Sequence, residues 1–261
     1  MVDVNHQWST VENNIFLLTN YPDLNFVSLN QVAGKLKINA TYDPTMNIVV
    51  INPKNYQNDS SYIDDEYIIR IELPDNPQTH LPIVFETAGR IRAVGEKKGI
   101  TNNLDLHLYK NGCVCLCPRP LLIERIINGK SKSLPSLLDE LITPYFYQQS
   151  YFERFGHWPI KNYSHGFQAI FEYYFRESNK TGETNRQLLE LCSASMKELA
   201  MLESRPYLKV LVEQKKEIKP TSKCFCGSNR KYKKCHRRLF TKDAKLGFSL
   251  YLSDLRKKDI S

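Results

Sequence analysis

The apolar residues near the start of the chain repeat with the period of a helix. The pattern Ser9-x-x-Glu12 is typical of a capping box, and Val11, Ile15 and Leu18 lie at helical spacing around and after it. The segment Asn20-Tyr-Pro22 should end this helix, because a proline disfavours helical backbone in the residue before it. We therefore predict that the chain opens with an amphipathic helix.

The period then changes to two, as expected for strands with one face toward solvent. Apolar and polar residues alternate over residues 36–42 and again over residues 67–73. Met46 to Ile51 is a further strand candidate, and Asp43-Pro44 marks the turn before it. Residues 90–103 hold two glycines and several charges, which predicts a loop.

Helical spacing returns in the second half of the chain. Residues 136–151 have the pattern of a helix that Pro144 must kink or break. Residues 167–174 carry an apolar stripe, and another helix should start at Thr184 and end at Arg205-Pro206. His165, just before the middle helix, is either a second active-site group or a capping or loop histidine.

Three cysteines stand within five residues at Cys113, Cys115 and Cys117. The preceding pair Asn111-Gly112 is typical of a tight turn, because both residues tolerate positive φ. Such a turn would fold the chain back and let His107 approach Cys115, and an imidazole beside a thiol favours a nucleophile. The alternative is that the three cysteines simply belong to a half-buried strand.

The segment Gly112-x-x-Cys115-Leu116 resembles the active site of ubiquitin-conjugating enzymes. The family's asparagine, eight residues before its cysteine, corresponds to His107, and the family's His-Pro-Asn is missing, as in divergent bacterial relatives. The order of elements is also similar to that of the family. A helix is followed by strands, by Pro74 and Pro77, by a fourth strand at 81–85, by the active-site segment and then by helices. The resemblance implies an α+β fold: an antiparallel four-stranded meander with flanking helices, followed by a helical extension and a small zinc knuckle.

The resemblance also implies a chemistry. Cys115 would carry a ubiquitin-like or other C-terminal-glycine donor as a thioester and transfer it to an amine of a target protein. His107, with Asn111 or backbone N–H groups, would stabilise the oxyanion. A separate activating enzyme would be required. Bacterial relatives of this kind serve anti-phage (CBASS-type) operons, where the target can be a cGAS-like nucleotidyltransferase.

Composition limits the class of protein. With 261 residues, 41% hydrophobic and 25% charged, the chain is typical of a soluble protein with a main domain and an accessory module. Residues 1–14 contain no apolar run and no later stretch approaches a membrane span, so we expect neither a signal peptide nor a membrane anchor. The seven cysteines are clustered, which favours a cytoplasmic location, with metal binding or reactive thiols rather than disulfides.

The net charge of +8 is concentrated near the C-terminus. Residues 205–240 hold 12 Lys and Arg against two Glu, a net charge of +10, so the main body is acidic. The basic residues that could contact phosphates of a ribosome or nucleic acid are Lys231, Lys233, Lys234, Arg237 and Arg238.

Within this basic segment, Cys224-Phe-Cys226-Gly-Ser and Cys235-His236 supply four nitrogen and sulfur ligands, the set of a closed tetrahedral zinc site. The segment resembles the SEC-C motif of the SecA tail. That resemblance implies a structural Zn²⁺ held by Cys224, Cys226, Cys235 and His236, and a surface that binds partners.

We predict four segments: a catalytic domain at 1–160, a helical extension at 161–215, the zinc motif at 216–240 and a tail at 241–261. Two classes of function remain open. One is the cysteine transferase described above. The other is a non-catalytic adapter that contains zinc and binds protein partners, or contacts a ribosome or nucleic acid through its basic segment.

Overall fold

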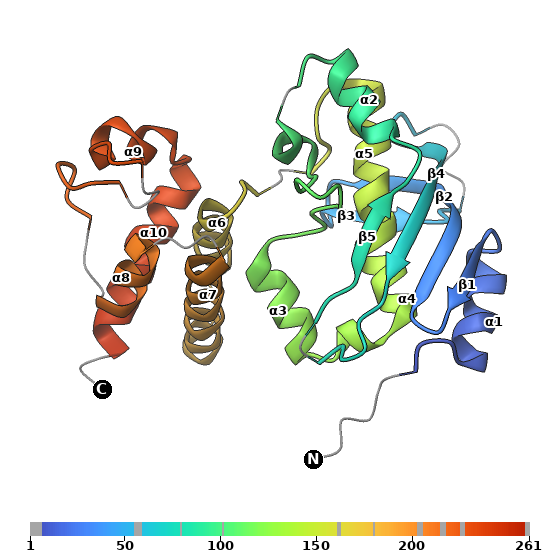
Figure 1. Cartoon of the computed structure of the whole chain (residues 1–261), viewed down its shortest axis with the longest axis horizontal. Coiled ribbons are helices and arrows are strands. Elements are labelled where there is room, and N and C mark those ends of the chain that lie inside the picture. Colours follow the sequence, from blue (N-terminus) through green and yellow to red (C-terminus); the bar gives the residue numbers. More distant parts are fainter. Residues whose placement is uncertain are drawn as a thin grey trace. The chain divides into compact units, whose positions relative to one another are not determined.

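The computed structural model describes residues 7–54, 59–78, 80–100, 102–160, 163–179, 181–202, 206–214, 218–224 and 228–258. The chain forms two compact units (Figure 1). The first unit comprises residues 1–117 and 125–162, and the second comprises residues 118–124 and 163–261. None of the helices in the described ranges has the length and apolar composition that a membrane span needs.

The first unit is built on an antiparallel sheet, which confirms the α+β class. Its five strands in the described part of the chain are β1 (Leu24–Ser28), β2 (Gln31–Asp43), β3 (Ile48–Ile51), β4 (Ile63–Glu72) and β5 (Ile83–Glu86). They lie in the order β1-β2-β4-β5, and β3 pairs with the C-terminal end of β2. The expected four-stranded meander is therefore wrong in two respects. There is an additional strand, β1, and β4 pairs with β2 instead of with β3.

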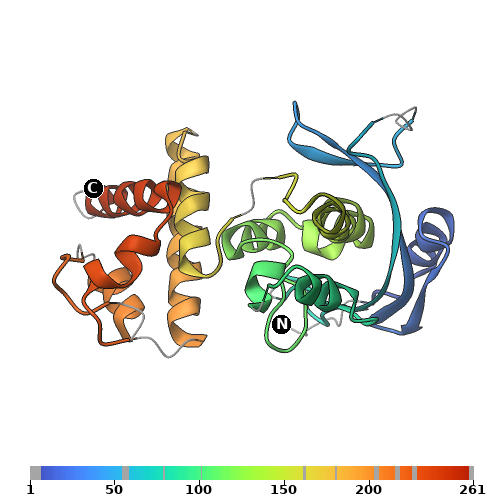
Figure 2. The same ribbon diagram turned by 90° about the horizontal axis from the view of Figure 1, so that it is seen from above.

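β2 is the strand around which the sheet is organised. It pairs with β4 along ten residues, from Gln31 opposite Glu72 to Ala40 opposite Ile63. Leu36, Ile38 and Ala40 are fully buried and alternate with partly exposed or exposed residues, as their period of two predicted. The buried face packs against α5 (Thr143–Phe155), which runs inside the curve of the sheet (Figure 2).

The first helix, α1 (Val11–Asn20), is confirmed, but its inward face is not the expected one. The N-cap is Thr10, whose side chain accepts a hydrogen bond from the Asn13 N–H. The predicted apolar stripe of Val11, Ile15 and Leu18 is largely exposed, and Leu17 is the buried residue of the helix. The period showed a helix here, but packing against β1 and α4 decided which face is covered.

The residues around Pro144 form a continuous helical run with a local change of pitch. The run consists of α4 (Leu134–Leu137), a π-helical turn (Leu138–Ile142) and α5. Pro144 lies in the first turn of α5, directly after the wide π turn. Proline has no N–H to donate, so a change of hydrogen-bond pattern at this point replaces the expected break.

The predicted loop at 90–103 is wrong, because most of it is helical. It contains α2 (Arg90–Lys97), followed by a 3₁₀ turn at Asn103–Leu106. The two pack closely: a Cβ on Gly95 would lie 2.3 Å from a methyl group of Leu106. A glycine in the middle of a helix lowers the helical signal of the sequence, but here it allows the close approach.

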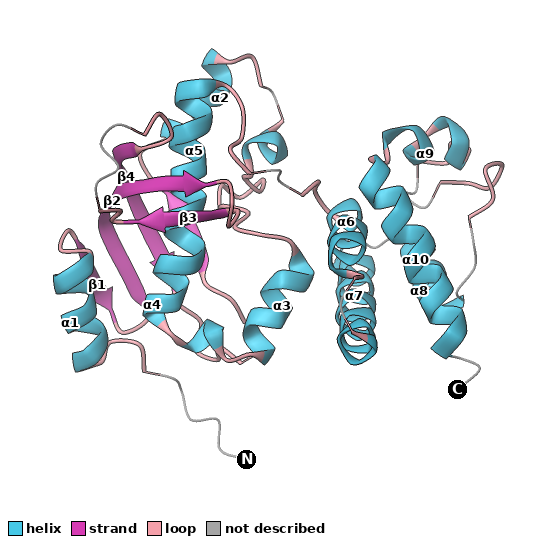
Figure 3. Ribbon diagram, turned by 180° about the vertical axis from the view of Figure 1, so that it is seen from behind, coloured by secondary structure: helices cyan, strands magenta, loops and turns pink. Residues whose placement is uncertain are grey.

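The second unit is helical, with one hydrophobic core (Figure 3). Its helices are the start of α3 (Arg119–Ile127), α6 (Phe167–Glu177), α7 (Gly182–Leu202), α8 (Pro206–Gln214), the 3₁₀ turn Tyr232–Lys234, α9 (His236–Leu239) and α10 (Lys242–Lys258). Helix α10 lies against α6, and Gly247 permits this because a Cβ there would meet the carbonyl oxygen of Phe171 at 1.7 Å. Tyr232 and Phe240, next to the predicted zinc ligands, belong to the same core as α6 and α7. The helical segment, the motif and the last helix thus share one core.

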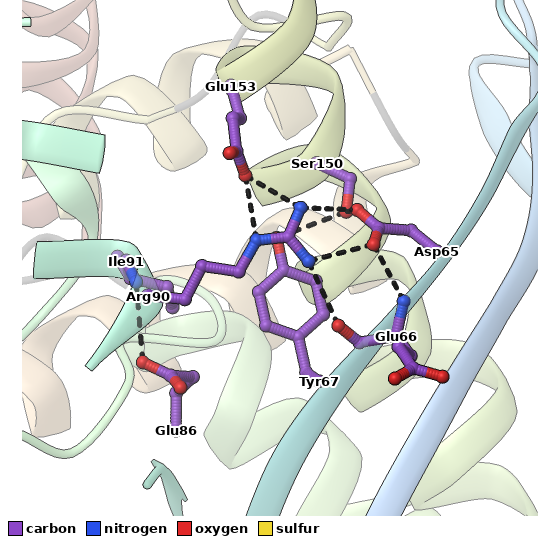
Figure 4. Close-up of polar contacts among 8 residues, drawn as sticks. All are labelled: Asp65, Glu66, Tyr67, Glu86, Arg90, Ile91, Ser150 and Glu153. Atoms are coloured by element: carbon purple, nitrogen blue, oxygen red, sulfur yellow. Dashed lines mark hydrogen bonds and ion pairs between the residues drawn. The ribbon is translucent and has the colours of Figure 1, made fainter. Parts of the chain in front are cut away.

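A charged cluster ties three elements of the first unit together (Figure 4). The Arg90 guanidinium at the start of α2 donates to both carboxylate oxygens of Asp65 in β4, at 2.8 and 2.6 Å. It also donates to Glu153 in α5 at 2.8 Å and lies over the Tyr67 ring, 4.6 Å from its centroid. Ser150 of α5 adds a 2.7 Å hydrogen bond to Asp65. Two-pronged pairs of this kind fix orientation as well as distance.

This cluster makes stability depend on pH. Burial raises the pKa of Asp65, but the hydrogen bonds from Arg90 and Ser150 outweigh it and leave the pKa below its ordinary value. A carboxyl group whose pKa is lowered in the folded state stabilises the fold at pH values above its unfolded-state pKa of about 3.9. That stabilisation disappears as the pH falls through the folded-state pKa.

We therefore expect Asp65→Asn to lower the free energy of unfolding by about 2 kcal/mol at pH 7, and by progressively less as the pH falls through the folded-state pKa of Asp65. Both tryptophans, Trp8 and Trp158, belong to the first unit, so urea unfolding followed by tryptophan fluorescence reports on it alone. Asp64→Asn, at the exposed neighbouring position, is the control. Equal losses for the two variants would show that the cluster does not stabilise the fold.

Candidate functional site

The three-cysteine segment forms a tight hairpin, as the Asn111-Gly112 pair predicted. Gly112 has φ +86°, and its N–H donates to the carbonyl oxygen of Tyr109 at 2.9 Å. Leu108 and Val114 form an antiparallel bridge on either side of the turn. The hairpin is joined to the sheet because the Val114 N–H donates to the Val84 carbonyl oxygen of β5 at 2.8 Å.

The hairpin brings His107 and Cys115 together. The Cys115 N–H donates to the His107 carbonyl oxygen at 2.7 Å, and a ring nitrogen of His107 lies within 4.8 Å of the Cys115 sulfur. His107 has left-handed backbone angles, φ 54° and ψ 40°, which a residue with a Cβ rarely adopts. Local strain of this kind persists only where the surroundings hold it, and it is concentrated at functional sites.

Helix α5 and the segment after it hold His107 from the other side. The Tyr145 hydroxyl donates to the His107 carbonyl oxygen at 3.1 Å. The Gln149 amide donates to the Leu106 carbonyl oxygen and to the Tyr145 hydroxyl, both at 2.9 Å. The ring of Trp158 meets the imidazole edge-on, with 4.9 Å between centroids. The backbone and the ring of His107 are therefore both positioned by contacts far away in the sequence.

The surroundings of Cys115 favour the protonated thiol over the thiolate. Burial raises its pKa, a hydrogen bond with the Tyr109 side chain lowers it, and the net shift is upward. Burial also raises the pKa of Cys113, and raises that of Cys117 strongly. At neutral pH the resting thiols are therefore protonated, and attack by Cys115 requires a base that removes its proton during the reaction.

Asn111 lies at the tip of the hairpin, and the contacts that the structure shows for it are with Cys113. Its side-chain oxygen accepts a hydrogen bond from the Cys113 N–H at 3.2 Å. This is the Asx-turn contact by which asparagine supports a tight turn. Of the predicted catalytic residues, His107 and Cys115 are thus brought together, whereas Asn111 shapes the loop that joins them.

A second candidate site lies in the C-terminal unit, where Cys224, Cys235 and His236 meet. Their ligand atoms all lie within 4.8 Å of one another, and both cysteines are buried. The His236 Nδ1 atom is 3.1 Å from the Cys224 sulfur and 3.4 Å from the Cys235 sulfur. Sulfur and nitrogen ligands of one tetrahedral zinc ion are separated by about 3.5 Å, so these three residues fit such an ion.

A short hairpin positions these ligands. The Cys224 N–H donates to the Arg230 carbonyl oxygen, and the Tyr232 N–H donates to that of Ser222, each at 2.7 Å. Asn229, next to Arg230, has a left-handed φ of 57°. The fourth predicted ligand, Cys226, falls outside the described residues.

His165, the other histidine that the sequence singled out, belongs to the second unit and directly precedes Gly166, the N-cap of α6.

A family model of the SEC-C motif matches residues 221–238, which include all four predicted ligands. Comparison with curated proteins and with solved structures gave no match. The SEC-C part of the predicted resemblance is therefore confirmed, and the similarity to ubiquitin-conjugating enzymes stays a prediction.

Sequence reasoning missed the residues that surround His107 and Cys115. They are Tyr109, Tyr145, Gln149 and Trp158, and no sequence motif marks any of them as a site residue. Tyr109 lies in the hairpin itself, six residues before Cys115. The other three reach the site through contacts that depend on the tertiary fold. A single sequence has no pattern that could link them to it.

We expect the purified protein to carry about one metal ion per chain, zinc by the chemistry of its ligands, and Cys224→Ser/Cys226→Ser to lose it. Because the motif shares its core with α6 and α7, removing the metal should lower the melting temperature of the second unit. Elemental analysis and far-UV circular dichroism measure the two effects, and the tryptophan fluorescence of the first unit should not change. Cys192→Ala, a buried cysteine of the same core, should retain the metal. Metal-free wild-type protein would contradict this prediction.

Proposed function

We propose that the first unit is a cysteine transferase of the ubiquitin-conjugating type, which carries an acyl donor on Cys115 and passes it to an amine. The observation that supports this proposal best is the hairpin, in which the Cys115 thiol and the His107 imidazole are held within 4.8 Å of each other. An adjacent base is one of the ways in which an enzyme activates a thiol nucleophile.

In the first step the Cys115 sulfur attacks the carbonyl carbon of an activated donor, such as a thioester on an activating enzyme. The new carbon–sulfur bond forms as the donor's thiol leaves. Because burial raises the pKa of Cys115, its proton has to be removed during the attack, and neutral His107 is placed to accept it. The proton then passes to the departing thiolate.

In the second step a neutral amine attacks the thioester carbonyl carbon and the carbon–sulfur bond breaks. Cys115 leaves as a thiolate and takes up the proton that the amine nitrogen loses, because its pKa is raised. The His107 ring can donate a hydrogen bond to the oxyanion that develops, while the Tyr109 hydroxyl stabilises the departing sulfur. The Cys115 N–H is already bonded to the His107 carbonyl oxygen, so it is not an oxyanion donor in this arrangement. Asn111, engaged with Cys113, supports the loop.

The partners follow from this chemistry and from the family resemblance. They are a ubiquitin-like protein or another donor that ends in glycine, a separate activating enzyme, and a target protein, with a cGAS-like nucleotidyltransferase in an anti-phage operon as the proposed case. In the second unit, Zn²⁺ on Cys224, Cys226, Cys235 and His236 would be structural. The location we propose is the cytoplasm, where the thiols stay reduced.

The alternative function is a non-catalytic adapter that binds partners through its metal-containing unit. The specific observation in its favour is that the pKa of each of the three hairpin cysteines is raised. A reactive thiol more often has a lowered pKa. Thiol-exchange measurements separate the two functions.

A synthetic peptide thioester ending in Gly-Gly replaces both the donor and the activating enzyme. We expect the wild-type chain to exchange with it and to gain one peptide mass that dithiothreitol removes, as observed by intact-mass spectrometry. Cys115→Ala should abolish this adduct, whereas Cys113→Ala and Cys117→Ala should retain it. An adduct of undiminished yield on Cys115→Ala would exclude the transferase proposal and favour the adapter.

His107→Ala should still form the adduct but transfer the peptide to 10 mM lysine about 10²-fold more slowly, the usual effect of losing one oxyanion donor. His157→Ala is the matched control, because His157 is an exposed histidine of the same unit. Single-turnover chase experiments measure the transfer rate of each variant. An unchanged rate for His107→Ala would remove the imidazole from the mechanism.

A further inference from the structure

The second unit contains a pocket of about 590 Å³, within the usual range for ligand sites. It is open to solvent and is lined by two kinds of side chain, cationic and aromatic: Tyr232, Lys233, Arg237, Arg238, Phe240, Lys245 and Phe248. No carboxylate is among these lining residues. The pocket lies beside the candidate metal site and uses none of its predicted ligands.

The four cations come from two separate parts of the chain. Lys233, Arg237 and Arg238 flank the Cys235-His236 pair, and Lys245 is contributed by α10. All four are exposed, and within the described residues none of them is paired with a carboxylate. Elsewhere in this unit basic residues do have partners, as in the pair of Arg176 with Asp243. An uncompensated cluster of this kind attracts anions and binds them when they arrive.

The floor of the pocket is aromatic and rigid. Phe240 stacks with Phe248, with 6.2 Å between the ring centroids and 27° between the ring planes, and Tyr232 meets Phe240 edge-on. Phe171 of α6 supports both phenylalanines from below. Phe248 is partly exposed, so one ring is accessible to a ligand without any change in the core.

We propose that this pocket binds single-stranded nucleic acid, with a backbone phosphate on Arg237 and Arg238 and a base against the aromatic floor. Two neighbouring guanidinium groups match phosphate oxygens, and an aromatic floor matches the flat face of an unpaired base. In a duplex the bases stay stacked and cannot enter a pocket. A polyglutamate peptide would satisfy the cations but offers no planar ring to the aromatic floor. This site is independent of the thiol chemistry of Cys115.

The test is fluorescence anisotropy of labelled 12-nucleotide oligo-U and oligo-dT with the full chain, between 50 and 200 mM KCl. Arg237→Gln/Arg238→Gln removes two charges from the pocket, and Lys209→Gln/Lys257→Gln removes two exposed charges elsewhere in the unit. Each phosphate contact of a single strand contributes about 0.7 to the logarithmic salt slope. Because both arginines hold the same phosphate in this proposal, the pocket variant should lose about 0.7 of the slope and bind about fivefold more weakly at 0.1 M salt.

Phe248→Leu keeps an apolar side chain but removes the ring, and it should weaken binding about tenfold, in the range known for one stacked base. A 12-base-pair duplex should bind more weakly than either single strand. Circular dichroism melting of each variant establishes that the unit is folded. The proposal is overturned if both double variants lose affinity equally, if the duplex binds as tightly as the single strands, or if a polyglutamate peptide displaces oligo-U at equal charge concentration.

Discussion

The ion pair between Arg90 and Asp65 joins three elements of the first unit (Figure 4). Arg90 begins α2, Asp65 lies in β4, and Glu153 of α5 completes the cluster, so a single guanidinium fixes two helices against the sheet. These two helices are also the ones that hold the segment before the cysteine hairpin. Gly95 of α2 packs on Leu106, and α5 donates hydrogen bonds to the Leu106 and His107 carbonyl oxygens. The charged cluster and the segment that carries the His107 imidazole are therefore connected through the same two helices.

The second unit combines two chemistries in one short segment. Cys235 and His236 face Cys224 in the candidate metal site, while Lys233 before them and Arg237 and Arg238 after them line the basic pocket. Both sites are supported by the same aromatic core on α6, through contacts of Phe167 with His236 and of Phe171 with Phe240. A metal ion that orders the Cys-His pair would also order the cations next to it. We therefore expect metal binding and anion binding to be coupled.

The sequence by itself determined the features that depend on neighbouring residues. The period of two located β2 and β4, the Asn111-Gly112 pair located the hairpin, and the spacing of Cys224, Cys235 and His236 located the metal cluster. In each case the geometry follows from backbone preferences or ligand spacing over a dozen residues or fewer. That is why the α+β class and the SEC-C motif could be predicted without a structure.

The tertiary structure alone decided which surfaces are covered and which distant side chains meet. The apolar stripe of α1 proved to be exposed, and residues 90–97 became a helix despite Gly95 because α2 packs on Leu106. Tyr145 and Trp158 reached His107, and Lys245 joined the pocket, through contacts between elements far apart in the chain. The free energy of such contacts depends on complementary shape and burial, which leave no periodic pattern in a single sequence.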